Sequence, residues 1–286
     1  MVRFSFSTHQ LLGSRLFPRL SPLLFLPSCT IQSNETIYLQ HKYYFRRLYL
    51  LMCMKLLQKI PTGCRKLDEI LEGGFPLGSI SLIYGEAETA KTTLAIQCAV
   101  NCARKGAKVL FVDCDGTFSP RRLSQIASKD IEKVAENIIL ARPKDFKEQS
   151  TLIDQLANYL AKDFSLAVFD TITHLYRLEV AEKPEKTFEL NRELNRQMAW
   201  LAQIAKTHRV AVLVVSQVRS VFDNVQVAVE PVATRVLKFW ADVIITLKPT
   251  ENPKVVEAIV DKMGAKQQQT SCLMWIGLTG LSEHTL

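Results

Sequence analysis

The sequence predicts an α/β fold in which a mostly parallel, twisted sheet is flanked by helices, and three observations support this. From residue 55 onward, segments with helical periodicity alternate with short runs of β-branched and other apolar residues. These runs are continuously apolar, as expected of strands that are buried on both faces. One of the runs leads directly into a loop and a helix with the residue pattern of a phosphate-binding loop.

The expected elements follow one another along the chain in this alternation. Strands are expected at residues 79–84, 108–113, 166–170, 210–216, 242–247, 255–261 and 271–276. Helices are expected at residues 91–105, 120–128, 146–162 and 186–207. The last strands are expected to be antiparallel, so that one domain of residues 55–286 combines a parallel sheet with a C-terminal antiparallel part.

Residues 1–54 differ in composition from the rest of the chain. They hold six Lys and Arg residues against a single acid, Glu35, and they show no sustained helical or strand periodicity. We expect a leader without fixed structure, or an extension upstream of a real start codon at Met52 or Met54. The acid-poor, Arg- and Ser-bearing composition also allows an organelle transit peptide. A secretory signal is disfavoured because the apolar run at residues 20–26 is interrupted by Pro22 and follows a long polar stretch. A membrane span is disfavoured because no apolar run reaches the ~18 to 20 residues that a span requires.

The net charge and the cysteines limit the classes of function. The formal net charge is +8, but residues 1–54 contribute +5 of it, so contact with nucleic acid would depend on a local patch. The seven cysteines form no CxxC pair, which indicates a reducing, cytoplasmic setting rather than a disulfide framework. Cys98 and Cys102 lie one helical turn apart; we interpret them as buried core residues, with a metal site as the alternative.

The loop GEAETAKTT, residues 85–93, matches the phosphate-loop pattern GxxxxGK[ST] except that Ala90 replaces the second glycine. Backbone N–H groups and the start of a helix would bind phosphates. Lys91 would reach the β- and γ-phosphates of ATP, and the Thr92 hydroxyl would bind Mg²⁺. A Thr- and Ala-rich turn that only resembles such a loop is the alternative. The expected nucleotide-binding residues are Gly85, Glu86, Ala87, Glu88, Thr89, Ala90, Lys91, Thr92 and Thr93.

Ala90 bears on hydrolysis more than on the fold. If this position requires a positive φ, a Cβ atom there costs roughly 1 kcal/mol or more and tilts an amide away from the phosphate. ATP binding in a weakened form is compatible with that cost.

Polar residues end three of the other expected strands. Asp115, which follows Asp113 by two residues, is the candidate general base, with the shaping of a turn as the alternative. Asp170 ends an apolar strand and is the candidate for supporting Mg²⁺; its alternative role is to cap the next helix. Gln217 is the candidate sensor of the γ-phosphate, and ordinary polarity at a strand end is its alternative.

Several blocks of the sequence together resemble the RadA/Rad51-type recombinases. They are LDEILEGGFPLGSISLIYGEAETAKTTLAIQ, VLFVDCDGTFSPRRL, DTITHLYRLE, NRELNRQMAWLAQIAKTHRVAVLVVSQV and LKFWADVIITLK, in unbroken order between about residues 55 and 280. The resemblance implies a RecA-like P-loop NTPase core that binds ATP and Mg²⁺. It also implies the same roles for residues 85–93, Asp170 and Gln217, and it places Asp115 where the family has Glu or Asp.

Two absences make the chain similar to the archaeal RadB family within this group. No helix-hairpin-helix domain precedes the core, and the segment between Gln217 and Val236 is short and lacks the Gly-rich pattern of a recombinase DNA loop. This resemblance implies a DNA-binding accessory protein of homologous recombination and DNA repair, with very weak ATPase activity and no strand exchange of its own. It implies the recombinase RadA and a Holliday junction resolvase as partners, no membrane association, and leaves a homo-oligomer open.

Candidate DNA-binding residues lie in two regions. Arg219, Arg235 and Lys238 flank the expected loop, and Lys262 and Lys266 lie around Gly264. They would neutralise phosphates of single-stranded or branched DNA without reading bases, although solvated surface charge is the alternative for each. Phe222 would stack on an unpaired base or pack on the core.

Two other functions remain open from the sequence. One is an active RadA-like recombinase or DNA-dependent ATPase. The other is a RecA-like signalling ATPase that does not act on DNA.

Overall fold

The computed structural model describes residues 59–160, 163–223, 226–231 and 233–283. Within these ranges the chain forms a sheet of ten strands and a separate pair of two-residue strands. The strands are β1 Lys59–Ile60, β2 Phe75–Pro76, β3 Ile80–Gly85, β4 Lys108–Asp113, β5 Ile138–Ala141, β6 Phe164–Asp170, β7 Ala211–Asp223, β8 Gln226–Pro231, β9 Val243–Pro249, β10 Val255–Met263, β11 Lys266–Gly277 and β12 Gly280–Glu283. The helices are α2 Arg65–Ile70, α3 Lys91–Arg104, α4 Pro120–Ala127, η1 Ser128–Asp130, α5 Ile131–Ala135, α6 Phe146–Tyr159, α7 His174–Glu182, η2 Pro184–Lys186, α8 Thr187–His208 and α9 Thr234–Trp240.

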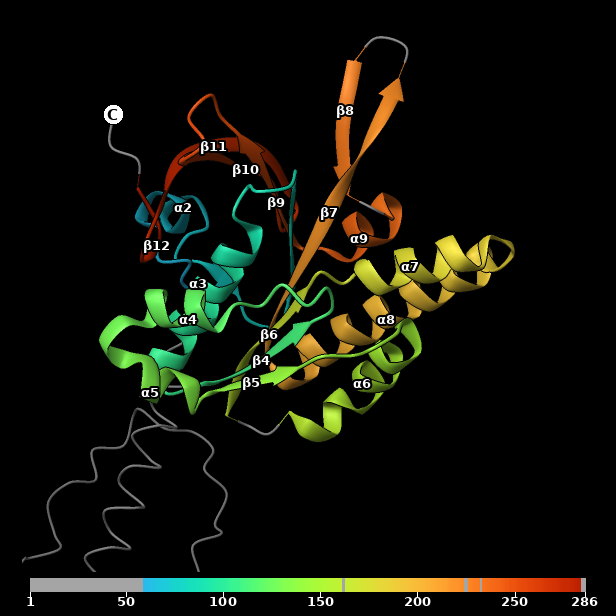
Figure 1. The fold of residues 1–286 in the computed structure, drawn as a ribbon, viewed down its shortest axis with the longest axis horizontal. Helices are drawn as coiled ribbons and strands as arrows, with labels where there is room; N and C mark the ends of the chain where they lie inside the picture. The colour runs from blue at the N-terminus through green and yellow to red at the C-terminus, as the bar shows by residue number, and fades with distance from the viewer. Residues whose placement is uncertain (1–58, 161–162, 224–225, 232, 284–286) are drawn as a thin grey trace, which may run out of the picture. The chain divides into compact units, whose positions relative to one another are not determined.

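The sheet confirms the predicted fold class. Its strand order is β12-β11-β10-β9-β3-β7-β6-β4-β5, with β8 paired to β7. The strands from β9 to β5 are parallel to their neighbours, whereas β10, β11 and β12 are added antiparallel to the edge at β9 (Figure 1). The parallel part places the carboxyl ends of β3, β7, β6 and β4 side by side.

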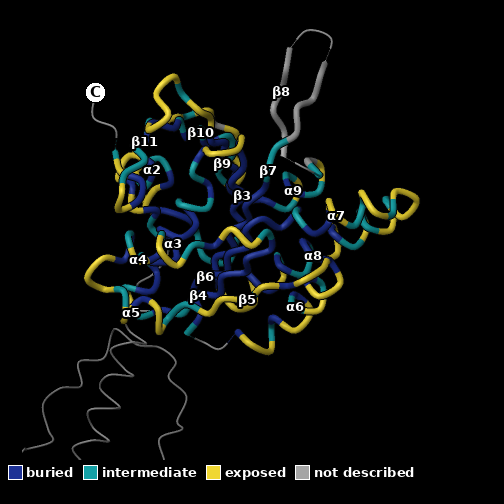
Figure 2. Tube along the Cα trace, viewed as in Figure 1, coloured by how far each residue is buried: buried dark blue, intermediate teal, exposed yellow. Residues whose placement is uncertain are grey.

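Both faces of the sheet are covered by helices, as the continuous apolar strands predict. Ile83 belongs to a core that includes α3, α4 and α5, whereas the preceding residue, Leu82, belongs to a core that includes α6, α8 and α9. Figure 2 shows the central strands as buried and the outer faces of the helices as exposed. Cys98 and Cys102 lie in the first core as free thiols, which confirms them as buried core residues.

Local signals define the starts of two helices. The Ser119 hydroxyl accepts a hydrogen bond from the Arg122 amide at 3.2 Å, and Pro120 follows as the first residue of α4. Asp145 accepts from the Glu148 amide at 2.6 Å, while the Glu148 carboxylate accepts from the Lys144 amide at 2.8 Å. These caps satisfy amides that have no partner within the helix.

The largest difference from the expected elements lies after Gln217. The chain does not leave the sheet there but continues in β7 to Asp223 and returns as β8, with Val218 opposite Pro231 and Asp223 opposite Gln226. The β-branched residues of this segment favour strand conformation. The expected DNA loop is therefore a β-hairpin that extends beyond the neighbouring strands (Figure 1).

The described residues contain no helix that is long and apolar enough to cross a membrane.

A buried amide joins three distant parts of the chain. Gln97 of α3 donates from Nε2 to the carbonyl oxygens of Thr62 and Leu281, each at 2.9 Å, and its Oε1 accepts from the Leu281 amide at 2.6 Å. The side chain is only 5% exposed, so water cannot replace these bonds. Gln97 therefore fixes the segment before α2 and the strand β12 against the helix that follows the phosphate loop.

We predict that Gln97→Met lowers the free energy of unfolding by about 2 to 4 kcal/mol, because it leaves three backbone groups without partners at nearly constant volume. Denaturant unfolding measures the loss. The matched control is Gln155→Met on the exposed side of α6, with an expected change within about 0.5 kcal/mol. Equal losses in the two variants would contradict the role assigned to Gln97.

Candidate functional site

The predicted site residues meet at the carboxyl edge of the parallel strands. Gly85 at the end of β3 pairs with Gln217 of β7, and Asp113 at the end of β4 pairs with Asp170 at the end of β6. Because β7 and β6 are neighbours, these four residues line one edge of the sheet. This is the edge at which open α/β sheets bind ligands.

The loop between β3 and α3 has the backbone of a tight strand-to-helix turn. At Gly85 a Cβ atom would lie 2.2 Å from the carbonyl oxygen of Leu247 in β9, so a side chain there would collide with the neighbouring strand. Ala90 has φ of 63° and ψ of 26°, the left-handed conformation that glycine adopts more readily. The condition under which Ala90 carries a cost, a positive φ at a residue with a Cβ atom, is therefore met.

Lys91, the first residue of α3, is a buried cation. Its side chain donates to the Glu86 carbonyl oxygen and lies 3.4 Å from the Thr89 hydroxyl, which itself donates to Glu86 at 2.8 Å. Burial lowers the pKa of Lys91, and the acids Asp170, Asp115 and Glu86 partly offset this effect. No carboxylate of the described residues forms an ion pair with Lys91 within 4.0 Å. An anionic ligand would supply the missing negative charge.

Asp170 is the complementary buried anion. It is 1% exposed, and neither carboxylate oxygen has a hydrogen-bond partner among the described residues. Burial raises its pKa to about 7; the Thr92 hydroxyl and Lys91 act in the opposite direction, whereas Asp115 and Asp113 raise it further. Helix α7 begins at His174 without a side-chain cap, so Asp170 does not cap that helix.

The surroundings of Asp170 fit a divalent cation. A carboxylate without partners beside a threonine hydroxyl is the donor set that Mg²⁺ uses, with water and phosphate oxygens completing the shell. The cation would neutralise the charges that raise the pKa of Asp170. Among the described residues there is no cluster of three or more His, Cys, Asp and Glu side chains that could hold a metal by themselves. The metal would therefore be bound together with a phosphate ligand.

The two acids after β4 have different partners. Asp113 is 2% exposed, and its Oδ2 pairs with Arg142 at 2.8 Å while Oδ1 accepts from the Phe118 amide at 3.3 Å. Asp115 accepts at Oδ1 from the Thr117 amide at 3.1 Å and from the Thr117 hydroxyl at 2.6 Å. Both carboxylate oxygens of Asp113 therefore make contacts within the protein. One oxygen of Asp115 shapes a turn, which is the alternative role that the sequence analysis gave to this residue.

Gln217 contacts a helix that the sequence did not predict. Its Oε1 accepts a hydrogen bond from Nη1 of Arg177 in α7 at 2.6 Å. The amide that was predicted to sense phosphate is therefore hydrogen-bonded to a cation of helix α7.

The candidate DNA residues lie in or near helix α9 and the hairpins β7–β8 and β10–β11. Arg235 and Lys266 are exposed, Lys238 lies 5.5 Å above the Tyr84 ring, and Lys262 donates to the Ala241 carbonyl at 2.6 Å. The backbones of Arg219 and Phe222 lie in β7, but their side chains are outside the described part of the structure.

Sequence reasoning missed Arg142 and Arg177. Arg142 directly follows β5, whose apolar run IILA is a signal for a strand and could have placed the arginine at the same sheet edge. Arg177 belongs to a nine-residue helix, which is too short for a reliable helical period.

An apolar cavity of about 570 Å³ lies away from this edge, between β5 and α6. Leu110, Ile139, Leu156 and Phe164 contribute to its lining, whereas Lys91 and Asp170 do not. The cavity is therefore separate from the candidate site.

Sequence and structure comparisons identify the family of proteins that this chain resembles. The sequence model of the Rad51 family matches residues 54–278. The chain is 39% identical over 206 residues to the DNA repair and recombination protein RadB of Thermococcus gammatolerans, an alignment that covers 71% of this chain and 89% of that protein. It is 34% identical over 191 residues to RadB of Methanosphaera stadtmanae, covering 66% and 80%. The crystal structure of the RadB recombinase matches with a TM-score of 0.67 at 31% identity, covering 79% of this chain and 100% of that one.

We predict that Asp170→Asn stabilises the ligand-free protein by about 1 to 3 kcal/mol at pH 8, because it removes a buried charge that has no partner. Thermal unfolding without nucleotide or divalent cation measures the change. Asp115→Asn is the control and gives no gain, because Asp115 is half-buried and already bonded to Thr117. A loss of stability in Asp170→Asn would show that the carboxylate is neutralised in the ligand-free protein.

Proposed function

This chain belongs to the Rad51 family, in the branch of the RadB proteins, and on that premise we propose that it is a DNA-binding and ATP-binding accessory protein of homologous recombination and DNA repair. One observation carries the proposal. Among the described residues, a buried lysine without an ion pair and a buried aspartate without a hydrogen-bond partner lie together where a phosphate-type loop enters its helix. Mg²⁺ and a nucleoside triphosphate supply the opposite charges that both groups lack.

Each part of the edge has a task in binding ATP. The amides at the start of α3 and the Lys91 ammonium bind the phosphates. Thr92 and Asp170 hold Mg²⁺, which neutralises charge on the phosphate oxygens. Gln217 is the proposed sensor of the γ-phosphate and would pass that contact to Arg177; its pairing with Gly85 in register and its hydrogen bond from Arg177 support this role. The nucleotide then acts mainly as a conformational ligand.

Two features support very weak hydrolysis. Ala90 holds a left-handed conformation that costs an alanine roughly 1 to 2 kcal/mol, and this strain lies at the entrance to α3. Asp115 is the proposed general base, yet its Oδ1 already accepts two hydrogen bonds from Thr117, which restrict its reach toward an attacking water.

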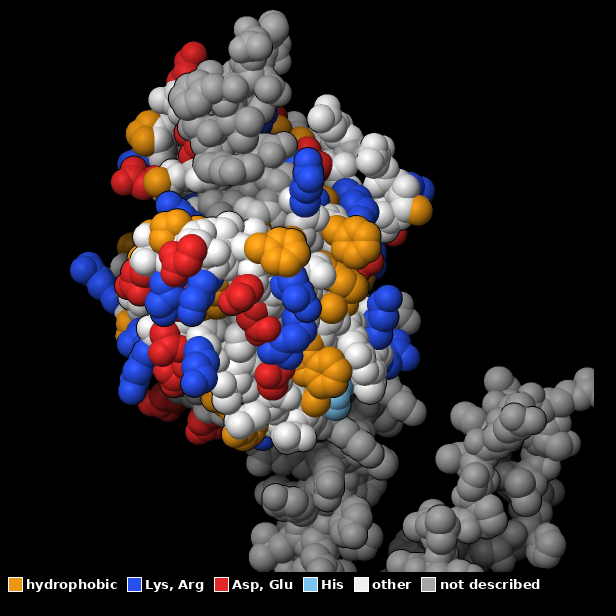
Figure 3. All heavy atoms as spheres, turned by 90° about the vertical axis from the view of Figure 1, so that its right-hand side faces the viewer, with side chains coloured by type: hydrophobic (Ala, Val, Ile, Leu, Met, Phe, Trp, Pro, Cys, Tyr) orange, Lys and Arg blue, Asp and Glu red, His pale blue; other side chains and the backbone are white. Residues whose placement is uncertain are grey.

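DNA contacts would come from a local group of cations. On the side of the molecule that carries α7, α8 and α9, basic and acidic side chains are interspersed and separated by hydrophobic ones (Figure 3). Charge alone does not mark a patch in this view, so we assign phosphate contacts to the cations that the sequence singled out around α9 and the hairpins, together with stacking by Phe222. The members of the group are Arg219, Arg235, Lys238, Lys262 and Lys266.

The family also supplies the proposed partners and setting. RadA and a Holliday junction resolvase are the proposed protein partners, and the cytoplasm is the proposed location. Self-association is supported by the apolar cavity beside β5, the outermost described strand of the parallel part, where Ile139 is 48% exposed.

We predict that ATP turnover is negligible with or without single-stranded DNA. Ala90→Gly is expected to raise the turnover by roughly tenfold, because glycine adopts the left-handed conformation without the strain that alanine carries. A tenfold change in rate corresponds to a barrier lowered by about 1.4 kcal/mol. Steady-state phosphate release measures the turnover. Ala90→Val is the matched control and lowers turnover or stability, because a β-branched residue tolerates positive φ worse than alanine. Brisk DNA-stimulated turnover by the unmodified protein would instead favour an active recombinase or DNA-dependent ATPase.

We predict salt-sensitive binding to single-stranded DNA, with a slope of log K against log[salt] that falls by about 0.7 to 1 in Arg235→Ala and in Lys266→Ala. Fluorescence anisotropy over a salt series measures the slope. The control is Lys129→Ala, an exposed lysine in η1 on the other face of the sheet, and leaves the slope unchanged. Absence of salt-sensitive DNA binding would favour a signalling ATPase that does not act on DNA.

A further inference from the structure

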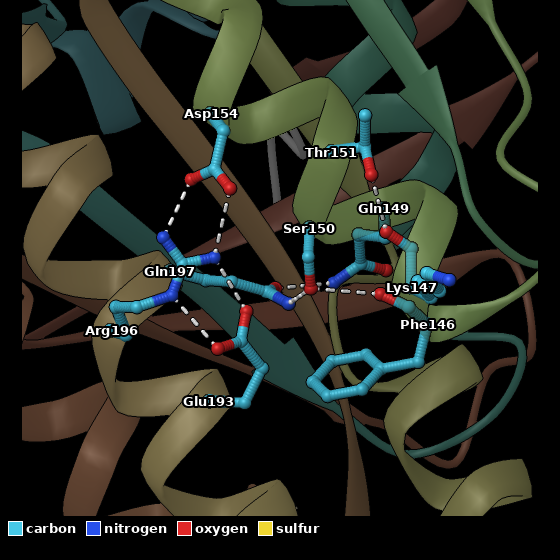
Figure 4. A network of polar contacts seen from close by, with 9 residues as sticks. All are labelled: Phe146, Lys147, Gln149, Ser150, Thr151, Asp154, Glu193, Arg196 and Gln197. Carbon is cyan, nitrogen blue, oxygen red and sulfur yellow. Dashed lines mark hydrogen bonds and ion pairs between the residues drawn. The ribbon is translucent and has the colours of Figure 1, made fainter.

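A buried polar cluster joins the two helices that cover the sheet on the side opposite α3. Gln149 of α6 and Gln197 of α8 are both 0% exposed. Gln149 Nε2 donates to Gln197 Oε1 at 2.8 Å, and Gln197 Nε2 donates to the Ser150 hydroxyl at 2.6 Å (Figure 4). Two amides surrounded by apolar side chains are costly unless they are bonded, so their presence requires a reason.

Gln149 makes one contact that Gln197 does not. Its Nε2 also donates to the carbonyl oxygen of Ile172 at 3.1 Å. A primary amide nitrogen carries two hydrogens, so both bonds of Nε2 can exist together. Ile172 lies two residues beyond Asp170, so Gln149 ties α6 to the segment that carries the buried carboxylate.

Residues 170–172 depend on contacts of this kind. Asp170 is the last residue of β6, and residues 171–173 connect it to the start of α7 outside regular structure. The Cys114 amide donates to the Asp170 carbonyl at 2.7 Å, and the Ile172 amide donates to the Val215 carbonyl at 3.1 Å. Gln149 therefore completes a set of hydrogen bonds that reach the segment from β4, β7 and α6. Neither oxygen of the Asp170 carboxylate has a hydrogen-bond partner among the described residues, so the position of the carboxylate depends on the backbone that carries it.

The cluster is one of several contacts that join α6 and α8. Arg196 of α8 binds Asp154 of α6 through Nη1 at 2.6 Å and Nη2 at 3.1 Å, and it pairs with Glu193 of its own helix (Figure 4). Gln149 Oε1 has no partner among the described residues, which is a cost that an apolar side chain would avoid. This cost, together with the bond from Gln149 to the Ile172 carbonyl, points to a role in the site.

We propose that Gln149 is a positioning residue for the metal–nucleotide site: by holding the Ile172 carbonyl it fixes the backbone of residues 170–172 and thus directs the Asp170 carboxylate at Mg²⁺. This inference rests on the proposed function of ATP binding. Groups that position a metal ligand through hydrogen bonds, without contacting the metal themselves, contribute strongly to metal affinity.

The test compares Gln149→Met with Gln197→Met. Both variants remove the amide–amide bond from the same buried cluster at nearly constant volume, but only Gln149→Met removes the bond to Ile172. The affinity for a fluorescent ATP analogue is measured with Mg²⁺ and with EDTA, and the ratio of the two affinities gives the gain due to Mg²⁺. We expect Gln149→Met to lower this gain by roughly tenfold and Gln197→Met to lower it by less than about twofold. In both variants the affinity in EDTA stays as in the unmodified protein.

The outcomes distinguish the positioning role of Gln149 from the proposed binding of ATP. An equal effect of the two substitutions on the Mg²⁺ gain, or none in either, overturns the positioning role while leaving ATP binding intact. Failure of the unmodified protein to bind the analogue in Mg²⁺ overturns the proposed function and this inference together. If Gln149→Met does not fold, Gln149→Asn is measured in the same way: its amide is one methylene too short for Ile172, so an unchanged Mg²⁺ gain overturns the role and a reduced one supports it.

Discussion

The rest of the site depends on two buried charges, Lys91 and Asp170, for which the described residues of the ligand-free protein supply no direct neutralising partner. Taking a charged group out of water costs several kcal/mol unless a counter-charge and hydrogen bonds replace the water. Here the Lys91 ammonium contacts a carbonyl and a hydroxyl oxygen, and the Asp170 carboxylate has no partner among the described residues. A polyphosphate would neutralise the Lys91 ammonium, and Mg²⁺ bound to it would neutralise the Asp170 carboxylate.

The chain order of the strands creates this arrangement. The phosphate-type loop follows β3, while the acids follow β4 and β6, and the sheet order sets β7 between β3 and β6. Parallel strands end at the same edge, so residues far apart in the sequence converge there. The apolar cores on both faces hold the strands, while Gln97 and Gln149 tie the flanking segments to that edge through buried amides. Different residues therefore stabilise the fold and carry the two buried charges of the site.

Patterns within single segments predicted the frame and the loop. The strand at residues 108–113 was predicted with its observed bounds. Because Ala90 replaces the second glycine of the phosphate-loop pattern, the sequence raised the question of a positive φ there, and the structure has it. The partners of the site residues could not be predicted in this way. Arg142 reaches Asp113 across 29 positions of sequence, Arg177 reaches Gln217 across 40, and Gln149 reaches Ile172 across 23. Such pairs depend on how helices pack on the sheet, which local periodicity does not specify. The β7–β8 hairpin was missed because the segment was interpreted through its missing glycines rather than through its β-branched residues.

The central claim is that Lys91 is the buried counter-charge of a bound Mg·ATP. Isothermal titration calorimetry of the full chain with Mg²⁺ and a non-hydrolysable ATP analogue tests it most directly, with Lys91→Ala compared against Lys105→Ala, an exposed lysine just after the other end of α3. The account predicts that Lys91→Ala weakens binding by roughly tenfold to a hundredfold and that Lys105→Ala binds as the unmodified protein does. Equal binding by Lys91→Ala and the unmodified protein would contradict it.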